Sequence, residues 1–501
     1  GARRESNPRP LLPQSSALTP ELQAPSTRLA VFIWLGYYKL DHLKEKLQMW
    51  QSFKSTKIWF WLVCSWFVCG ALATLAGFTG LFYPLLSVLL LLPICLIVLL
   101  LSSVFGTFSS FSKKEQIVVS LIILWWLLHS LQVFVPETGF DALWYHLPLA
   151  QQTVINHRFI GTTEFYQSFN PQFSDSIFYI GFAIAGETGA KIIAYLFGIS
   201  LVFTSYILSR QYLSRPSAFL ITLLVSSFQV VSWQSSSFYI DIAKAFWELS
   251  ALVLLLQKNS SAIPGGLAFG ASLASKLFSI LLLPLYIGLG WLEKGKRYAL
   301  NLVIISILVA VPFYLFAYFV SGNPFYSAFH HLETVQEIGS TAPPIFYIFN
   351  RLLIFPLAFV EMVKTREYTT PLLVLVFPLI LIFRKVILKN KTLLYLTIFT
   401  LYQLVIWWLV PPTSTRYALS GFITATVLTV LLLEKWLKDA KKKQLLFYSL
   451  LIVGILALPI RIGVALRSWE YISGQQTKSE YLEQFIDGNI DSVLKKWHQL
   501  D

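Results

Sequence analysis

Two aspartates, one lysine and one arginine stand at the predicted ends of apolar segments, where charged side chains are costly unless they serve a purpose. They are Asp141, Asp241, Lys276 and Arg416. Carboxylates beside two cations suit a lipid-phosphate substrate. A carboxylate can remove a proton from an acceptor hydroxyl or amine, while the cations hold the phosphate and neutralise the charge that grows on it as it leaves. The leaving phosphate needs no general acid.

Asp141 follows an apolar segment that ends near Val135, so we expect it at the membrane surface. Apolar residues recur after it at helical spacing and predict an amphipathic helix along the bilayer, with Trp144 and Tyr145 in the headgroup zone. Asp141 would begin that helix, and two interpretations stay open: a helix cap or a catalytic carboxylate. Tyr145 and His146 are candidates for an acceptor or sugar pocket.

Asp241, Lys244 and Glu248 are spaced i, i+3 and i+7 and therefore share one face of a helix. Charged groups at membrane depth must face a polar cavity or one another, so this stripe should point into the protein. Lys244 is a candidate ligand of the donor phosphate, and Glu248 is a candidate pocket residue. A plain ion pair between Lys244 and Glu248 is the alternative.

Lys276 lies within the apolar stretch 265–292, and Arg416 closes a short loop next to Tyr417. Either cation could simply extend to the membrane interface. Arg416, however, stands on the predicted outer side, where basic residues are scarce, and we expect it to bind an anion. Tyr417 is a further candidate for the pocket.

The elements that must position these residues are membrane-spanning helices. The chain of 501 residues is 56% hydrophobic and 13% charged, too apolar for soluble domains of ordinary size. Its apolar runs match the roughly 20 residues that a helix needs to cross the hydrocarbon. We predict an all-α polytopic transmembrane helix bundle, with amphipathic interfacial helices in the outer loops. The expected spans are 58–77, 80–104, 117–135, 188–208, 216–234, 240–257, 264–275, 278–292, 298–320, 371–388, 392–410, 417–435 and 446–464.

Lysine and arginine cluster in alternate connections, which predicts that those connections face the cytoplasm. The net charge of +14 is spread over these clusters and forms no continuous basic domain, so nucleic acid is not an expected partner. The outer side receives two long loops, 136–187 and 321–370, and long ordered loops tend to be functional. To keep the alternation, 265–292 must return as two short helices around Ser275–Lys276, and 345–360 should lie along the outer interface.

The same pattern divides the chain into four parts. We expect residues 1–57 to form a disordered tail and a cytoplasmic amphipathic segment, and 58–115 to contribute two additional spans. Residues 116–465 are the transmembrane core with both outer loops. Residues 466–501 are a short outer segment.

Several motifs together resemble the polytopic glycosyltransferases of the C superfamily, which contains the protein O-mannosyltransferases and the aminoarabinose transferase of lipid A. The resemblance covers roughly residues 115–465 and depends on the order and membrane side of the motifs. They are Phe140-Asp141-Ala-Leu-Trp-Tyr-His, Asp241, Gly265-Gly-Leu-Ala-Phe-Gly-Ala-Ser-Leu-Ala-Ser-Lys276, Ser321-Gly-Asn-Pro-Phe-Tyr326 and Arg416-Tyr-Ala-Leu.

This resemblance implies a polyprenyl-phosphate-linked monosaccharide donor, inversion at the anomeric carbon, and a lipid, glycan or protein acceptor outside the cytoplasm. It makes Asp141 the general base, Asp241 a second active-site acid, and Lys276 and Arg416 ligands of the donor phosphate. The chain departs from the pattern at its first site, where family members usually carry paired acids and Ala142 follows Asp141 here. The C-terminal segment is also short for an acceptor-recognition domain.

One other function, and the question of a metal, remain open at this point. A transporter or flippase for a lipid-linked or anionic solute would use the same charges along a pathway, and Glu248 fits that function better. The charges gather at outer ends of spans, however, whereas a transport route needs polar groups through the midplane. His330, His331, Glu333 and Glu337 match no standard set of metal ligands, so no metal site is predicted, although some members of the superfamily use a divalent cation.

The setting predicted for the protein is a bacterial plasma membrane. The chain is rich in Phe, Leu and Lys and has two Met. This composition favours a bacterial membrane. Together with the apolar runs and the distribution of lysine and arginine, it predicts a multi-pass protein surrounded by membrane lipids, with its active site on the periplasmic or extracellular face.

Overall fold

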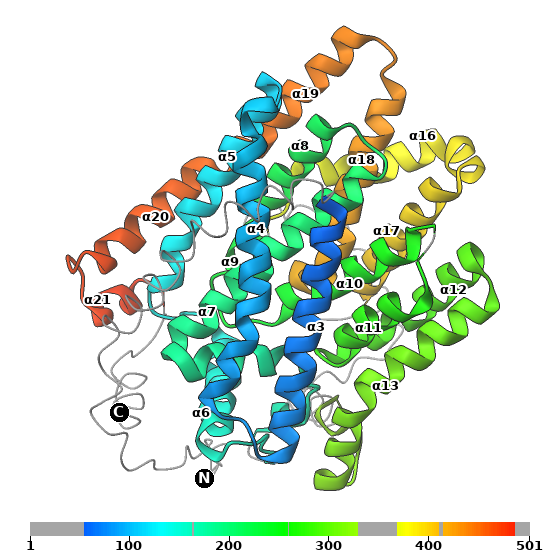
Figure 1. Cartoon of the computed structure of the whole chain (residues 1–501). Coiled ribbons are helices and arrows are strands. Elements are labelled where there is room, and N and C mark those ends of the chain that lie inside the picture. The colour runs from blue at the N-terminus through cyan, green and yellow to red at the C-terminus, as the bar shows by residue number, and fades with distance from the viewer. Residues whose placement is uncertain (1–54, 163–164, 259, 329–367, 410–413, 486–501) are drawn as a thin grey trace, which may run out of the picture.

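The computed structural model describes residues 55–162, 165–258, 260–328, 368–409 and 414–485 (Figure 1). These residues are mainly helical and include no named β-strand, and they contain ten helical stretches that are long and apolar enough to cross a membrane. The chain is thus a multi-pass membrane protein, and the predicted all-α bundle is confirmed. The tail 1–54, the segment 345–360 and the metal candidate at 330–337 lie outside the described residues.

The helices occur in an order that follows the apolar runs of the sequence. The longer ones are α3 (Ser55–Thr79), α4 (Leu91–Thr107), α5 (Lys113–Ser130), α7 (Phe173–Arg210), α10 (Asp241–Leu256), α13 (Lys296–Ser321), α16 (Val376–Lys389), α17 (Lys391–Leu409), α18 (Leu419–Trp436), α19 (Ala440–Ile455) and α20 (Leu458–Ile472). The shorter helices and turns are η2 (Pro84–Leu90), η3 (Phe108–Ser110), η4 (Leu131–Phe134), η5 (Ala142–His146), α6 (Leu147–Asn156), η6 (Tyr166–Phe169), α8 (Arg215–Ser226), α9 (Gln229–Gln234), α11 (Ala262–Leu273), η7 (Leu277–Leu282), α12 (Leu283–Lys294), η8 (Pro371–Leu375), η9 (Thr415–Ala418) and α21 (Lys478–Glu483).

Three stretches test the predicted spans in detail. The pair of short helices expected within 265–292 is confirmed, since α11 ends at Leu273 and η7 begins at Leu277. The predicted span 216–234 is instead two helices, α8 and α9. The predicted span 446–464 is also divided, because α19 ends before Pro459, which stands in the first turn of α20.

Helix α7 bends sharply at Ala185–Gly186. Both residues have non-helical backbone angles, and Gly186 has a φ of 56°, which favours glycine. The chain turns so tightly that a Cβ on Gly189 would lie 1.9 Å from the carbonyl oxygen of Gly181. The second half of α7 therefore begins where the span 188–208 was predicted, and the first half, from Phe173, belongs to the predicted loop 136–187.

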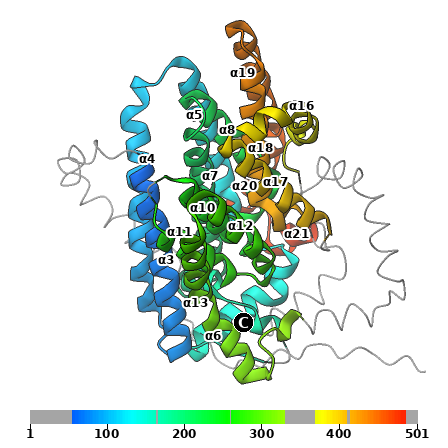
Figure 2. The ribbon, with the colours of Figure 1, turned by 90° about the vertical axis from the view of Figure 1, so that its right-hand side faces the viewer.

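Helix α10 lies at the centre of the bundle, where all of its residues except the last are buried. It packs against α7, α11 and α18, and Figures 1 and 2 show α3 and α4 side by side on one flank. Two tryptophans of α3 donate hydrogen bonds into α7, from Trp59 to Thr204 at 2.9 Å and from Trp66 to Ser200 at 3.0 Å. The additional N-terminal helix α3 is therefore docked on the core through polar as well as apolar contacts.

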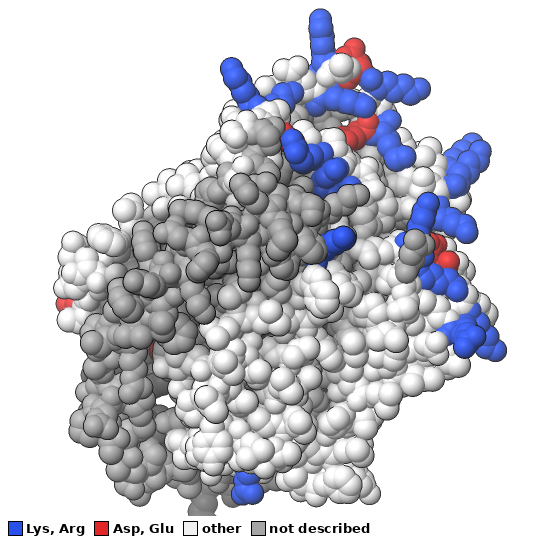
Figure 3. Space-filling model, in the orientation of Figure 1, with Lys and Arg blue, Asp and Glu red and all other residues white. Residues whose placement is uncertain are grey.

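Lysine and arginine side chains gather at one end of the molecule, around the ends of α16 and α19 (Figure 3). At the starts of α5 and α8, Arg215 donates from Nε to Glu115 at 2.5 Å and from Nη2 at 2.9 Å. Glu115 also completes the capping box that begins α5. Helix α6, which follows Asp141, lies toward the opposite end in Figure 1.

Candidate active site

Asp141, Asp241, Lys276 and Arg416 lie together although they come from four separate elements. Asp141 directly precedes η5, Asp241 begins α10, Lys276 follows α11, and Arg416 lies in η9. Nη2 of Arg416 lies 2.8 Å from Oδ2 of Asp141, and its Nε lies 3.8 Å from Oδ2 of Asp241. Nζ of Lys276 forms an ion pair with Oδ1 of Asp241. The structure therefore brings together the four residues selected from the sequence, and their chemical roles stay predictions.

The carboxylate of Asp141 does not cap the helix that follows it. Asp141 occupies the position before η5 but makes no capping hydrogen bond there, and its side chain, 19% exposed, faces Arg416. Its backbone N–H donates to the hydroxyl of Tyr239 at 3.1 Å. The capping interpretation is wrong for this residue, and its carboxylate is partly open to solvent.

Glu137 holds the loop that carries Asp141. It is 3% exposed, and its carboxylate oxygens accept four hydrogen bonds of 2.6 to 2.9 Å, from the backbone N–H groups of Thr138, Gly139 and Phe238 and from the hydroxyl of Ser237. These contacts connect the loop before Asp141 with the loop before Asp241. Glu137, the acid nearest to Asp141 in the sequence, therefore has a structural role and is not a second acid of the ion cluster.

Aromatic rings surround the guanidinium of Arg416. Its Cζ lies 4.9 Å from the ring centres of Tyr239 and Tyr417 and 5.7 Å from that of Trp233, and its Nη2 donates to the Tyr417 hydroxyl at 2.9 Å. The side chain is 11% exposed, and its buried Nε has no hydrogen-bond partner in the described part of the chain. Arg416 thus points into the protein beside Lys276, where planar N–H groups could bind phosphate oxygens.

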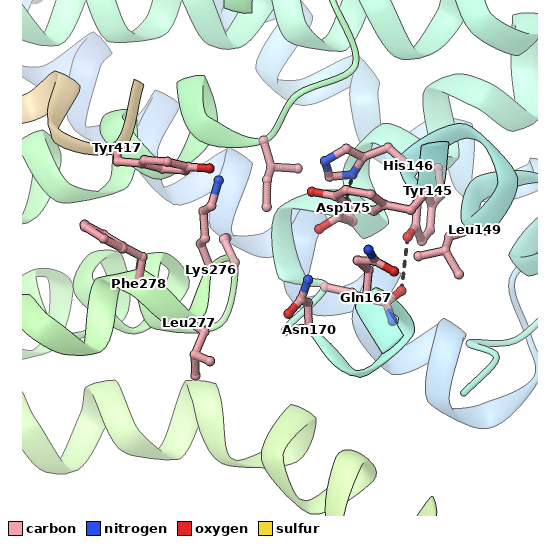
Figure 4. Close-up of a pocket in the computed structure, with 14 residues that line it drawn as sticks. Tyr145, His146, Leu149, Gln167, Asn170, Asp175, Lys276, Leu277, Phe278 and Tyr417 are labelled. Carbon is pink, nitrogen blue, oxygen red and sulfur yellow. Dashed lines mark hydrogen bonds and ion pairs between the residues drawn. The ribbon is translucent and has the colours of Figure 1, made fainter. Parts of the chain in front are cut away.

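A cavity of about 200 Å³ opens beside this ion cluster. Figure 4 shows Lys276 and Tyr417 on one side of it, across from Tyr145, His146 and Asp175. Three amide side chains add to the lining: Gln167, Asn170 and Gln172. Side chains that both donate and accept hydrogen bonds are suited to the hydroxyl groups of a sugar.

Asp175 is a cavity residue that the sequence reasoning missed. Its Oδ1 lies 2.8 Å from Nδ1 of His146, and both side chains are buried. This contact fixes the orientation of an imidazole that was predicted from the sequence to line the pocket. Asp175 lies in the first turn of α7, within a loop already expected to be functional, and an acid beside the apolar run 177–182 was the available signal.

Two tyrosines near Asp141 keep their protons. Burial, and to a smaller extent Asp141, raise the pKa of Tyr145 well above its ordinary value. The same two causes raise the pKa of Tyr239. Both hydroxyls are therefore neutral donors and acceptors at the edge of the site.

Lys244 and Glu248 lie deeper, along α10, and form a buried ion pair of 2.6 Å. Glu248 also accepts hydrogen bonds from Ser420 at 2.6 Å, Ser279 at 3.3 Å and Ser272 at 3.4 Å. Neither Lys244 nor Glu248 lines the cavity. The geometry is that of a plain ion pair, the alternative interpretation of the sequence. The predicted roles of Lys244 as a phosphate ligand and of Glu248 in the pocket stay predictions.

The described residues contain no group of three or more His, Cys, Asp or Glu side chains placed to hold a metal ion. Asp141 and Asp241, the two carboxylates at the ion cluster, are each engaged by a cation of the chain.

Comparisons with known proteins give similarity to solved structures at low sequence identity. No protein-family model and no curated protein sequence matches the chain. A crystal structure of ArnT from Cupriavidus metallidurans bound to undecaprenyl phosphate matches 72% of this chain and 70% of its own, with 15% identity and a TM-score of 0.48. The archaeal oligosaccharyltransferase AglB from Archaeoglobus fulgidus, in complex with an inhibitory peptide and a dolichol-phosphate, matches 71% of this chain and 56% of its own, with 14% identity and a TM-score of 0.43.

Proposed function

We propose that this chain is a membrane glycosyltransferase that moves a monosaccharide from a polyprenyl-phosphate carrier to a lipid, glycan or protein acceptor outside the cytoplasm, with inversion at the anomeric carbon. The observation that carries the proposal is the contact of Asp141 with Arg416, beside Lys276, which lines the adjoining cavity. The resemblance of the sequence motifs to the C-superfamily glycosyltransferases supplies the class of donor.

In the proposed reaction, Asp141 removes the proton from an acceptor hydroxyl or amine, and the acceptor atom forms a bond to the anomeric carbon from the face opposite the phosphate. The bond between that carbon and the phosphate oxygen breaks, and its electron pair leaves with the polyprenyl phosphate. The phosphate thereby gains one negative charge. Lys276 and Arg416 neutralise this charge in a site largely closed to water, where such contacts are strong.

Both cations are already paired with carboxylates, Lys276 with Asp241 and Arg416 with Asp141. A donor phosphate that binds Arg416 must therefore replace Asp141 as its partner, and Asp141 is then released to accept a proton. Lys276 can rotate toward the phosphate more readily than Asp241 can, because its side chain is 20% exposed and that of Asp241 is 1% exposed. Asp241 would thus stay as a buried anion that keeps both cations charged.

The side of the membrane is supported by the distribution of charge. Basic residues collect around the ends of α16 and α19 (Figure 3), and basic connections tend to face the cytoplasm. The helix that follows Asp141, α6, lies toward the other end of the molecule (Figure 1). This supports an active site on the periplasmic or extracellular face.

A transporter or flippase is the alternative function. It would need charged groups that are available to a solute deep in the bundle. Glu248, the residue that fits this function best, is 0% exposed and is engaged by Lys244 and by three serine hydroxyls. The deep charges are therefore already satisfied by one another, which favours the transferase.

The test is sugar transfer by the purified full-length chain, supplied with radiolabelled undecaprenyl-phosphate sugars and with lipid, glycan and protein fractions of a bacterial envelope as acceptors. We expect label to leave the lipid with wild type and to stay on the lipid with Asp141→Asn. Asp439→Asn is the matched control, because Asp439 is exposed, caps α19 at the basic end of the molecule, and asparagine caps helices equally well. Equal rates for wild type and Asp141→Asn would remove Asp141 from its role.

A further inference from the structure

A second cavity, of about 410 Å³, shares no lining residue with the first. It is bordered by α20, by η4 and by the loops that contain Glu137 and Ser236. Trp233 lines it and also contacts the guanidinium of Arg416. Trp233 therefore stands between the second cavity and Arg416. The proposed transfer reaction does not use this cavity.

Arg461 in α20 is the residue that makes this cavity unusual. It is 3% exposed, yet no carboxylate of the described residues forms an ion pair with it. Its Nη1 donates to Gln132 and, at 2.6 Å, to Nδ1 of His129, and its Nη2 donates to Oε1 of Gln229 at 3.4 Å. All three acceptors are neutral, so the structure buries a positive charge without an opposite charge, which is unfavourable within a membrane.

Two buried donors at this cavity also lack partners. Nε of Arg461 and Nε2 of Gln229 make no hydrogen bond among the described residues. Because Gln229 accepts from Arg461 through Oε1, its Nε2 must be the end that carries the unused N–H groups. The ring of Trp125, whose centre lies 5.7 Å from Cζ of Arg461, offsets part of the buried charge but carries no opposite charge. Two unused donors beside a cation without a carboxylate partner fit a ligand that has oxygen acceptors and a negative charge.

The rest of the lining agrees with an anion that carries an apolar part. Its charged members are three basic residues, Lys191, Arg461 and Arg467, and one acid, Glu137. The carboxylate of Glu137 is already engaged by four hydrogen bonds. Apolar contacts are available from Ile460, Val464 and Phe485, and Ile460 is 58% exposed on the outside of α20.

We propose that this cavity is a second binding site, for a phosphate-type oxyanion, with Arg461 and Gln229 as its buried ligands and Arg467 at its rim. The anion is either the headgroup of an anionic phospholipid, whose chains would follow Ile460 and Val464, or a free phosphate. In both cases the anion supplies the charge that Arg461 lacks. By filling the cavity beside Trp233, the bound anion would also hold in place the ring that contacts Arg416.

The experiment measures binding to full-length protein in neutral detergent micelles. Three probes are titrated: dioctanoyl phosphatidylglycerol, dioctanoyl phosphatidylcholine as its zwitterionic match, and inorganic phosphate. We expect saturable binding of phosphatidylglycerol to wild type, with Arg461→Gln weakening it roughly tenfold to hundredfold, the effect of losing a charged hydrogen-bond donor. Saturable binding of inorganic phosphate with the same dependence on Arg461 would identify a free anion as the ligand. Binding of phosphatidylglycerol without binding of inorganic phosphate would identify the lipid.

Three further variants separate this site from its surroundings. Arg467→Gln removes an exposed side chain, so it tests the site even if Arg461→Gln fails to fold, and it should also weaken binding. Lys441→Gln, an exposed change at the basic end, should not. Arg416→Gln should retain phosphatidylglycerol binding while losing the proposed donor site, so the two proposals fail separately. Equal binding of the two lipids to wild type, or unchanged phosphatidylglycerol binding in both Arg461→Gln and Arg467→Gln, would overturn the inference.

Discussion

Replacement of Asp141 by asparagine should move donor binding and turnover in opposite directions. In the free protein Arg416 is held by Asp141 at 2.8 Å, and a donor phosphate has to displace this partner. A hydrogen bond between charged groups contributes about 1.5–3 kcal/mol and a neutral one about 0.5–1.5 kcal/mol. Asparagine keeps the shape and an oxygen acceptor but loses the charge, so displacement becomes easier by about 1 kcal/mol, which is roughly a fivefold tighter Kd.

The same change removes the proposed base, and loss of a positioned base lowers the rate by roughly 10²–10⁴-fold. Undecaprenyl phosphate, the expected leaving group, is the probe for binding, and single-turnover sugar transfer measures the chemical step. Asp141→Glu is the companion variant, because it restores a carboxylate and should regain part of the rate. The reasoning is refuted if Asp141→Asn binds the probe more weakly than wild type, since Asp141 would then help to bind the phosphate and would not compete with it.

Three other changes test separate parts of the structure. Lys276→Gln should weaken binding of undecaprenyl phosphate by tenfold or more, because it removes a charge-assisted contact, and unchanged affinity would exclude Lys276 from the donor site. Lys244→Met alone should destabilise the protein by about 3–5 kcal/mol in denaturant titrations, because it leaves Glu248 as a buried charge without its partner. The double variant Lys244→Met, Glu248→Leu should recover most of this stability and retain affinity for undecaprenyl phosphate. Loss of that affinity in the double variant would instead support a ligand role for Lys244. Gly189→Leu should abolish folded yield in size-exclusion chromatography, because its Cβ would meet the Gly181 carbonyl oxygen at 1.9 Å, while Gly288→Ala, where no atom lies within 4 Å, should not.

The apolar pattern was sufficient for the architecture because a helix in lipid must satisfy its own backbone hydrogen bonds. The turn at Lys276 was predictable for a related reason: 265–292 lies between two basic segments and has to return to the same side. The division of 446–464 at Pro459 was missed because the apolar residues continue through it. The first half of α7 was missed as a helix because its apolar run is too short to cross the membrane, and membrane spans were identified by apolar length alone.

Part of the candidate site could also be predicted from the sequence, because charged residues are rare at membrane depth. Asp141, Asp241, Lys276 and Arg416 all stood out because no charged group is expected where they lie. Partners were harder to assign, since Asp241 pairs with Lys276 in space and not with Lys244 on its own helix face. The role of Glu137 depends on the backbone N–H of Phe238 and the hydroxyl of Ser237 in a distant loop, which no residue pattern reveals.

The pairing within the ion cluster also bears on how the proposed reaction is controlled. Two carboxylates balance two cations, so the site is close to neutral before any substrate arrives, and a lone anion gains little from entering it. A lipid-linked donor differs because its polyprenyl chain and its sugar contribute binding free energy away from the charges, and this can offset the separation of Asp141 from Arg416. The carboxylate then becomes available only when the phosphate is in place. An acceptor would therefore meet an active base only in the presence of the donor, which restricts proton removal to productive complexes.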